Sequence, residues 1–99
     1  IVYHPNFDSA YNNRGSVLMQ LGYPGLAFED YQRVLSINPG HITAHQNLAT
    51  YYTFRHELDK AGAMYDKILE IDPSNIPARE GKKNLFNKEN SEDARPGPD

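Results

Sequence analysis

Apolar side chains recur at spacings of three and four residues in five successive segments of this 99-residue chain. That periodicity is typical of α-helices with one buried face. The pattern predicts five helices, over residues 8–21, 24–37, 42–55, 58–71 and 76–88. Breaker residues stand between them, because Gly22 suits a left-handed helix end while Pro39 and Pro73 cannot continue a helix. The sequence therefore predicts an all-α fold with short connections.

The pattern of side chains repeats along the chain with a period of 34 residues. Three alanines lie at this interval, namely Ala10, Ala44 and Ala78. The segment 34–39 likewise aligns with the segment 68–73 after one period. A fixed period of this length is typical of helix-turn-helix arrays, in which each unit buries its apolar face against its neighbours.

Within each period the residues follow the spacing aromatic-x2-Leu-Gly-x2-Tyr, then Ala-x3-Phe, then Pro. The first period supplies Tyr11, Gly15, Leu18, Ala27, Tyr31 and Pro39. The second period supplies His45, Leu48, Ala49, Tyr52, Ala61, Tyr65 and Pro73. The chain thus resembles the tetratricopeptide repeat family over residues 5–86, although Arg14, His45 and His56 replace the Leu, the aromatic residue and the Gly usual there. This resemblance implies a helix-turn-helix solenoid of two repeats plus a C-terminal capping helix.

The resemblance divides the chain into five parts. These are the end of a truncated upstream repeat at 1–7, a first repeat at 8–41, a second repeat at 42–75, a capping helix at 76–88 and a disordered tail at 89–99. Lys82 and Lys83 take the positions of Leu48 and Ala49, so the last helix is expected to show a polar outer face. A start inside an upstream helix would leave the outer side of the first full helix uncovered, which favours self-association at that end.

Composition narrows the classes of function. The net charge is −3 and the repeats themselves are acidic, which argues against a nucleic-acid partner. No apolar run is long enough to form a membrane span. The chain has no cysteine, which excludes disulfides and thiolate metal sites and favours a reducing compartment such as the cytoplasm.

Candidate catalytic and metal chemistry is sparse in this sequence. His41 and His45 have the i, i+4 spacing of two ligands on one helix face. A metal site is nevertheless not expected, because no His-Glu-x-x-His pattern accompanies them and catalytic zinc normally takes three protein ligands. Neither a phosphate-binding loop nor a nucleophile elbow is present. The sequence predicts a protein that is not an enzyme and needs no cofactor.

Peptide binding is the function that the resemblance implies. In tetratricopeptide arrays the first helix of each pair lines a concave groove, and the family's groove positions fall here on uncharged residues. The candidate peptide-binding residues are Asn12, Asn13, Ser16, Gln20, Gln46, Asn47, Thr50 and Phe54. A polar, uncharged surface of this kind is also compatible with a merely solvated face.

Two subtypes of the family make different demands on these positions. Chaperone-binding members hold a terminal carboxylate with Lys, Asn and Arg, because a carboxylate needs charge-assisted donors. Asn47 fits one of these positions, but the positions that require Lys, Asn, Lys and Arg are occupied by Asn12, Ser16, Pro77 and Gly81, so this carboxylate site is not expected here. Asn13 and Asn47 instead resemble the asparagine ladder of O-GlcNAc transferase, in which an amide both donates to and accepts from a peptide backbone. A helix-solvating or inter-repeat role for these amides is the competing interpretation.

We therefore predict a protein–protein interaction module that binds an extended peptide segment in a concave, uncharged groove. Two alternatives are compatible with the same residues. In the first, the chain is a structural C-terminal cap of a longer superhelix. In the second, it presents substrates to a glycosyltransferase-like enzyme domain.

Overall fold

The structure is a computed structural model that describes the backbone of residues 7–94 and the side chains of residues 7–85. The described chain forms five helices, α1 (Phe7–Leu21), α2 (Pro24–Ile37), α3 (Ile42–Phe54), α4 (Leu58–Ile71) and α5 (Ile76–Ala94). No strand occurs within these residues. The all-α fold predicted from the sequence is confirmed.

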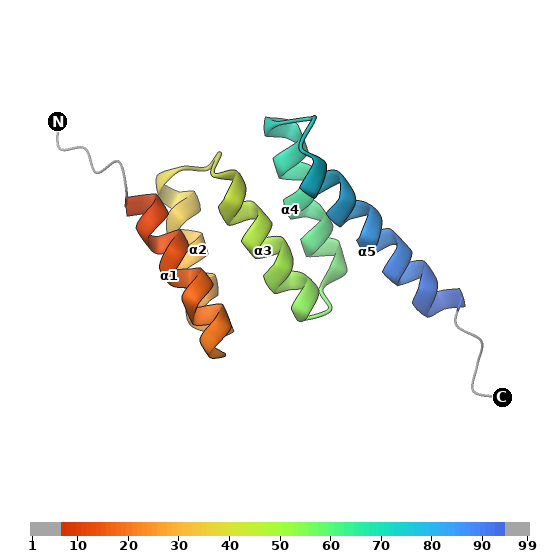
Figure 1. Ribbon diagram of the computed structural model, residues 1–99, viewed down its shortest axis with the longest axis horizontal. Coiled ribbons are helices and arrows are strands. Elements are labelled where there is room, and N and C mark those ends of the chain that lie inside the picture. Colours follow the sequence, from red (N-terminus) through yellow and green to blue (C-terminus); the bar gives the residue numbers. More distant parts are fainter. Residues whose placement is uncertain (1–6, 95–99) are drawn as a thin grey trace.

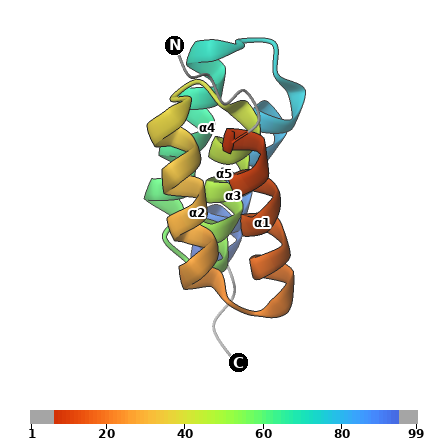
Figure 2. The same cartoon turned by 90° about the vertical axis from the view of Figure 1, so that its left-hand side faces the viewer.

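The helices form two antiparallel pairs and a fifth helix. Figure 1 shows α2 behind α1, and α4 between α3 and α5, both of which it contacts. Seen from the left-hand side, α1 and α2 lie next to each other in front of the later helices (Figure 2). The repeats therefore stack in sequence order, as the helix-turn-helix solenoid requires.

The helix boundaries agree with the sequence-based prediction except at the end of α5. The first four helices begin and end within one residue of the predicted positions. The fifth was expected to stop at residue 88 and give way to a disordered tail, but α5 runs to Ala94. The prediction for residues 89–94 is wrong because no glycine or proline occurs between residues 82 and 95, so nothing in the sequence ends the helix. Residues 1–6 and 95–99, and the side chain of Phe86, lie outside the described part.

The first helix of each pair ends in the same hydrogen-bonded turn. After α1, Tyr23 N–H donates to Leu18 O at 2.8 Å and Gly22 N–H donates to Met19 O at 3.1 Å. This is the Schellman arrangement, which needs a left-handed residue, and Gly22 has φ +90°. After α3 the same two bonds form around His56, which has φ +62°. His56 thus adopts the left-handed backbone conformation that Gly22 adopts one period earlier.

Small residues allow the helices to approach closely. A Cβ atom on Gly15 would lie 2.6 Å from Cε1 of Tyr31, and one on Gly81 would lie 2.6 Å from Cε1 of Tyr65. The two tyrosine rings, one per repeat, therefore fill the space left by a missing side chain on a neighbouring helix. Ala27, Ala49 and Ala61 have no exposed surface.

The repeats are joined by an apolar cluster. Its buried members are Ala27, Tyr31 and Leu48, with partly buried side chains packed around them. On the α2–α3 side, the rings of Phe28 and Tyr51 lie 4.9 Å apart between centroids. Aromatic pairs at this separation add stability beyond the area they bury, so the two repeats form one core.

Candidate functional site

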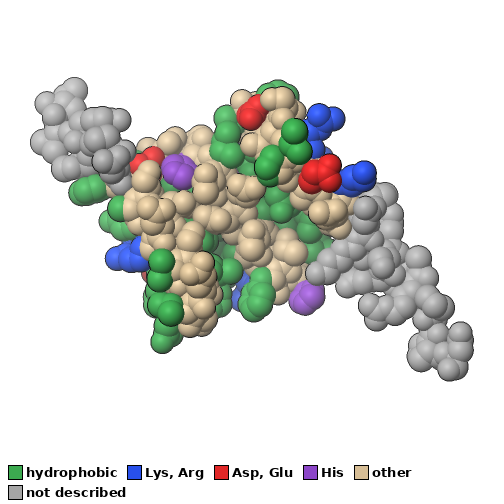
Figure 3. All heavy atoms as spheres, viewed as in Figure 1, with side chains coloured by type: hydrophobic (Ala, Val, Ile, Leu, Met, Phe, Trp, Pro, Cys, Tyr) green, Lys and Arg blue, Asp and Glu red, His purple; other side chains and the backbone are tan. Residues whose placement is uncertain are grey.

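The predicted groove residues lie on α1 and α3, but they differ in exposure. Figure 3 shows the face on which α1, α3 and α5 lie in front, and over α1 and α3 it is mostly polar and uncharged. The exposed members of the set are Asn13, Gln20, Thr50 and Phe54, and the partly buried ones are Ser16, Gln46 and Asn47. Asn12 is buried, with 7% of its surface exposed.

The structure joins three of these residues across the repeat boundary. Asn47 Nδ2 on α3 donates to Oδ1 of Asn12 on α1 at 2.9 Å, and lies 3.4 Å from Oγ of Ser16. The amide group of Asn47 therefore bonds α3 to α1, which is the inter-repeat role that competed with the ladder interpretation. Among the described residues, no hydrogen bond uses Oδ1 of Asn47 or the side chain of Asn13.

A hollow of about 240 Å³ opens beside this hydrogen-bonded group. It is lined by Ser16, Met19, Gln20, Tyr31, Asn47 and Thr50. The Thr50 hydroxyl donates to Gln46 O at 3.2 Å, and burial raises the pKa of Tyr31. The hollow is thus an uncharged depression whose lining is more apolar than polar, with Met19 and the Tyr31 ring beside the polar side chains. Asn13, Gln46 and Phe54 do not line it.

Tyr31 is a lining residue that the sequence analysis did not include. It is one of the residues of the repeat pattern, and its ring is buried, with 1% of its surface exposed. The sequence did contain a signal for this position. The Tyr31 ring packs on Gly15, which is next to the groove residue Ser16, so the ring reaches the groove side of α1.

A second polar cluster, also missed, lies between α1 and α2. Arg14 donates to Asp30 through Nε at 2.8 Å and Nη2 at 2.7 Å, and Arg33 Nη1 donates to Asp30 Oδ1 at 3.0 Å. The Asp30 side chain is only 1% exposed, and the hydrogen bonds from Arg14 hold its pKa below the usual range despite burial. In the second repeat, the same two positions carry Leu48 and Met64. Both positions change together between the repeats, from a charged pair to an apolar pair, and this joint change could have predicted the contact between Arg14 and Asp30 from the sequence.

His41 and His45 each form a local hydrogen bond to the backbone. His41 Nδ1 accepts the N–H of Ala44 at 3.0 Å and so caps α3. His45 is buried, and its Nε2 lies 2.9 Å from the carbonyl oxygen of Pro39. Within the described part of the chain, no three His, Asp or Glu side chains come together in a way that suits a metal ion.

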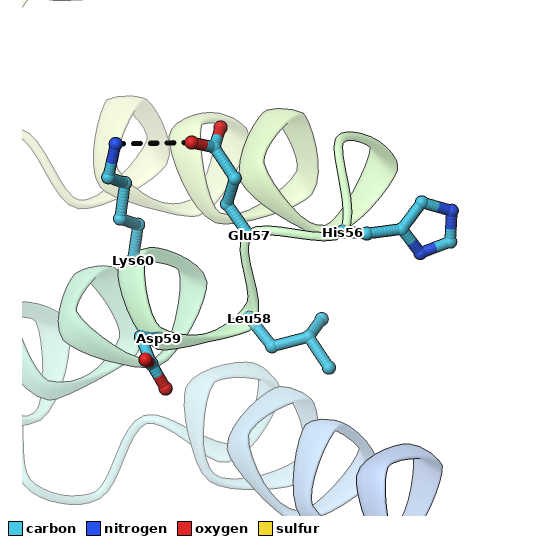
Figure 4. Close-up of a pocket in the computed structure, with 5 residues that line it drawn as sticks. All are labelled: His56, Glu57, Leu58, Asp59 and Lys60. Carbon is cyan, nitrogen blue, oxygen red and sulfur yellow. Dashed lines mark hydrogen bonds and ion pairs between the residues drawn. The ribbon is translucent and has the colours of Figure 1, made fainter. Parts of the chain in front are cut away.

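A further hollow, of about 380 Å³, lies at the turn between α3 and α4. Glu57 there is paired with Lys60 at 3.1 Å and with Arg55 at 3.0 Å. The side chains of His56 and Leu58 point away from the Glu57–Lys60 pair (Figure 4). Because the side chains diverge and the carboxylate is already neutralised, this turn does not present converging groups to a ligand.

One face of α1 differs from its counterparts in the later repeats. Ala10 is exposed, whereas Ala44 and Ala78, one and two periods later, have no exposed surface. Val17 is likewise 51% exposed, whereas its counterparts Tyr51 and Leu85 are each 8% exposed. Each later first helix is covered by the helix that precedes it, and α1 has no such cover among the described residues. None of the described helices is both long and apolar enough to cross a membrane.

Comparison with known proteins agrees with this architecture. Two family models, both described as tetratricopeptide repeat, match residues 9–41 and 42–75. The chain is 35% identical over 72 residues to the uncharacterized protein ycf37 of Pyropia yezoensis, a match covering 73% of this chain and 40% of that protein.

Two further relatives come from animals and yeast. The FK506-binding protein-like protein of Mus musculus is 34% identical over 76 residues, which covers 77% of this chain and 22% of that protein. Heat shock protein STI1 of Saccharomyces cerevisiae is 29% identical over 86 residues, which covers 87% of this chain and 15% of that protein. The chain thus spans less than half the length of these relatives. With both family matches falling on the two helix pairs of the structure, the chain belongs to the tetratricopeptide repeat family.

Proposed function

We propose that this chain is a non-catalytic interaction module whose uncharged α1–α3 face binds an extended peptide segment. Repeats of this family act as protein–protein interaction modules, and the extended surface of the stack is what such modules offer to a partner. The observation that carries the proposal is the uncharged hollow between α1, α2 and α3, beside which Oδ1 of Asn47 and the side-chain amide of Gln20 have no hydrogen-bond partner among the described residues.

The two asparagines of the proposed ladder have different tasks. Asn47 donates to Asn12, so its Nδ2 is engaged and only Oδ1 is left to accept a peptide N–H. Asn13 is exposed and has both its donor and its acceptor available. The proposed contact is therefore bidentate at Asn13 and a single hydrogen bond at Asn47.

An uncharged face also predicts how binding responds to salt. None of the eight candidate residues carries a charge, so the attraction comes from hydrogen bonds and apolar contact. Screening by salt acts on charged pairs, and we expect added salt to change the affinity little.

A phage-displayed library of random 12-residue peptides, panned on the chain, supplies probes for the test. Enriched peptides are synthesised and their affinity for the parent is compared with that for Asn13→Ala and Asn84→Ala. Loss of one or two neutral hydrogen bonds at Asn13 should weaken binding about threefold to tenfold. Asn84 is also exposed but lies on α5, outside the proposed groove, so its replacement is the matched control and should change nothing. Equal losses in the two variants, or failure to enrich any peptide, would contradict the proposal.

A second proposal concerns the uncovered face of α1. We infer that a second copy of the chain packs on this face, because Ala10 and Val17 are exposed where the later repeats bury the equivalent residues. Val17→Lys should then lower the mass measured by sedimentation, while Lys67→Glu, at an exposed position on α4, should not. The same sedimentation profile for parent and Val17→Lys at high protein concentration would count against it.

A further inference from the structure

One face of α1 and of α3 packs on the second helix of the same repeat. On α1 this face carries Arg14, which bonds to Asp30 of α2, and Gly15, which lies against the Tyr31 ring. On α3 the same face packs on α4. The next first helix, α5, contacts α4 but stands at the end of the row, and no described helix follows it (Figure 1).

The matching face of α5 is open and positively charged. Arg79 and Lys83 lie on it, and both side chains are exposed. Their counterparts on α3, one period earlier, are His45 and Ala49, which are only 6% and 0% exposed. Two long cationic side chains thus stand in solvent where the preceding repeat buries its residues against another helix.

These two cations have no acidic partner in the described chain. Lys82, the third cation nearby, is bound to Asp66 of α4, with its Nζ 2.6 Å from the carboxylate. Arg79 and Lys83 take part in no ion pair within residues 7–85. They stand four residues apart on one helix, a spacing at which like charges repel each other. Carboxylates supplied by another molecule would relieve this repulsion.

Apolar side chains stand in hollows on both sides of the two cations. A hollow of about 420 Å³ between α4 and α5 is lined by Leu69, Arg79, Lys82 and Lys83. Another, of about 450 Å³, is lined by Ile76, Arg79, Glu80 and Lys83. Ile76 is 67% exposed and Leu69 is partly buried. Glu80 is the single acidic residue in these linings, so the surface combines a net positive charge with apolar contacts.

We propose that this open face of α5, defined by Ile76, Arg79 and Lys83, binds an acidic amphipathic helix of another protein. A helix covers the same face of α1 and of α3, which favours a helical partner over an extended one. Carboxylates three or four residues apart on the partner share one side of its helix and lie opposite the two cations. Apolar side chains beside them enter the flanking hollows, and the opposed charges fix register and orientation.

A peptide library tests the proposal on the intact chain. Each peptide has about 18 residues and forms an amphipathic helix, with Leu and Ala on one face. Two positions four residues apart, at the edge of that face, hold Glu, Gln or Lys. Panning on the chain should enrich peptides with Glu at both positions, because only these oppose Arg79 and Lys83 with opposite charges.

Charge reversal on the protein then locates the site. Lys83→Glu should weaken binding of an enriched Glu peptide about tenfold or more, and added salt should weaken binding to the parent. Lys67→Glu makes the same charge change at an exposed position of α4 that lines neither hollow, so this matched control should bind like the parent. Ile76→Ser removes an apolar contact and should weaken binding about threefold.

Exchanging the charges supplies the decisive measurement. A peptide whose two Glu residues are replaced by Lys should bind Arg79→Glu/Lys83→Glu more tightly than it binds the parent. Asn13→Ala should bind the Glu peptide unchanged, because the groove on α1 and α3 is a separate site. Vesicles of phosphatidylserine should retain the chain no better than vesicles of phosphatidylcholine.

Each of these measurements can also contradict the proposal. Enrichment of Gln or Lys peptides, or of none, would overturn it. Equal losses in Lys83→Glu and Lys67→Glu, or no gain for the Lys peptide on the reversed protein, would do the same. A loss in Asn13→Ala would place the acidic peptide in the groove instead, and retention by phosphatidylserine would assign the cations to a lipid surface.

Discussion

The guanidinium of Arg14 donates two hydrogen bonds, of 2.8 and 2.7 Å, to the carboxylate of Asp30 and so joins α1 to α2 inside the first repeat. The Asp30 side chain is almost fully buried, while that of Arg14 is 59% exposed. The aromatic ring of Tyr11 lies beneath both cations of the cluster, 5.5 Å from Arg14 and 5.7 Å from Arg33. The first repeat thus uses an ion pair where the second uses Leu48 and Met64.

Replacing Arg14 alone should lower the stability of the fold far more than replacing Arg14 and Asp30 together. Arg14→Leu leaves a buried carboxylate with Arg33 as its one charged partner, and we expect the melting temperature to fall by roughly 10 °C. The double variant Arg14→Leu/Asp30→Met copies the apolar pair of the second repeat and should recover most of that loss. Melting curves followed by circular dichroism decide the matter, and a double variant no more stable than the single one would show that the two positions are not coupled.

The same carboxylate should dominate the acid sensitivity of the fold. The hydrogen bonds from Arg14 lower the pKa of Asp30 in the folded chain, whereas an unfolded chain binds the proton near pH 3.9. The unfolded state therefore binds more protons in this range, so the stabilisation is complete above about pH 4 and is lost as the pH falls through the folded-state pKa. Urea midpoints measured from neutral pH to below pH 4 should fall more steeply for the parent than for Arg14→Leu/Asp30→Met.

His56 should be a site where glycine is preferred. Its φ of +62° is a left-handed conformation that favours glycine, the residue found one period earlier at Gly22. His56→Gly should raise the free energy of unfolding by about 0.5 kcal/mol, since relief of backbone strain exceeds the added freedom of the unfolded chain. His56→Ala removes the same imidazole without freeing the backbone and should not stabilise. A gain shared by both variants would instead point to an unfavourable imidazole contact.

Two helical glycines should respond in opposite directions to alanine. A Cβ on Gly15 would lie 2.6 Å from the Tyr31 ring, so Gly15→Ala should lower the free energy of unfolding by about 1 kcal/mol or more. Gly62 on α4 has no neighbouring atom within 4 Å of the added Cβ, so Gly62→Ala should raise stability by about 0.5–1 kcal/mol. Chemical denaturation of both variants checks the pair, and stabilisation by Gly15→Ala would refute the close approach of α1 and the Tyr31 ring.

The side-chain amide of Asn47, which joins the two repeats, should contribute to the stability of the fold as well as to peptide binding. Asn47→Ala removes the donor to Asn12, whose oxygen is then buried without a partner, at a cost of about 1–2 kcal/mol. Asn13→Ala touches no described hydrogen bond and should unfold at the same urea concentration as the parent. Equal midpoints for Asn47→Ala and Asn13→Ala would show that the Asn12–Asn47 bond adds nothing to the fold.

The sequence by itself determined the repeat architecture. The 34-residue period, the small residues Gly15 and Ala27 and the breakers Gly22 and Pro39 act locally or along one helix face, so their meaning is independent of distant contacts. The first four helices accordingly begin and end where the pattern predicted, within one residue. The end of α5 was misjudged because low hydrophobicity was equated with disorder, although charged residues such as Glu and Lys are good helix formers.

Only the tertiary structure decided how the polar residues are used. Asn12 and Asn13 are neighbours in sequence, yet a rotation of about 100° per residue buries the first against α3 and leaves the second in solvent. Asp30 and Arg14 are 16 residues apart in the sequence, and they become a hydrogen-bonded pair only once α1 and α2 pack. The physical reason is the same in both cases: a polar side chain can be buried only where the fold brings it a partner, and the identity of that partner is a property of helix packing.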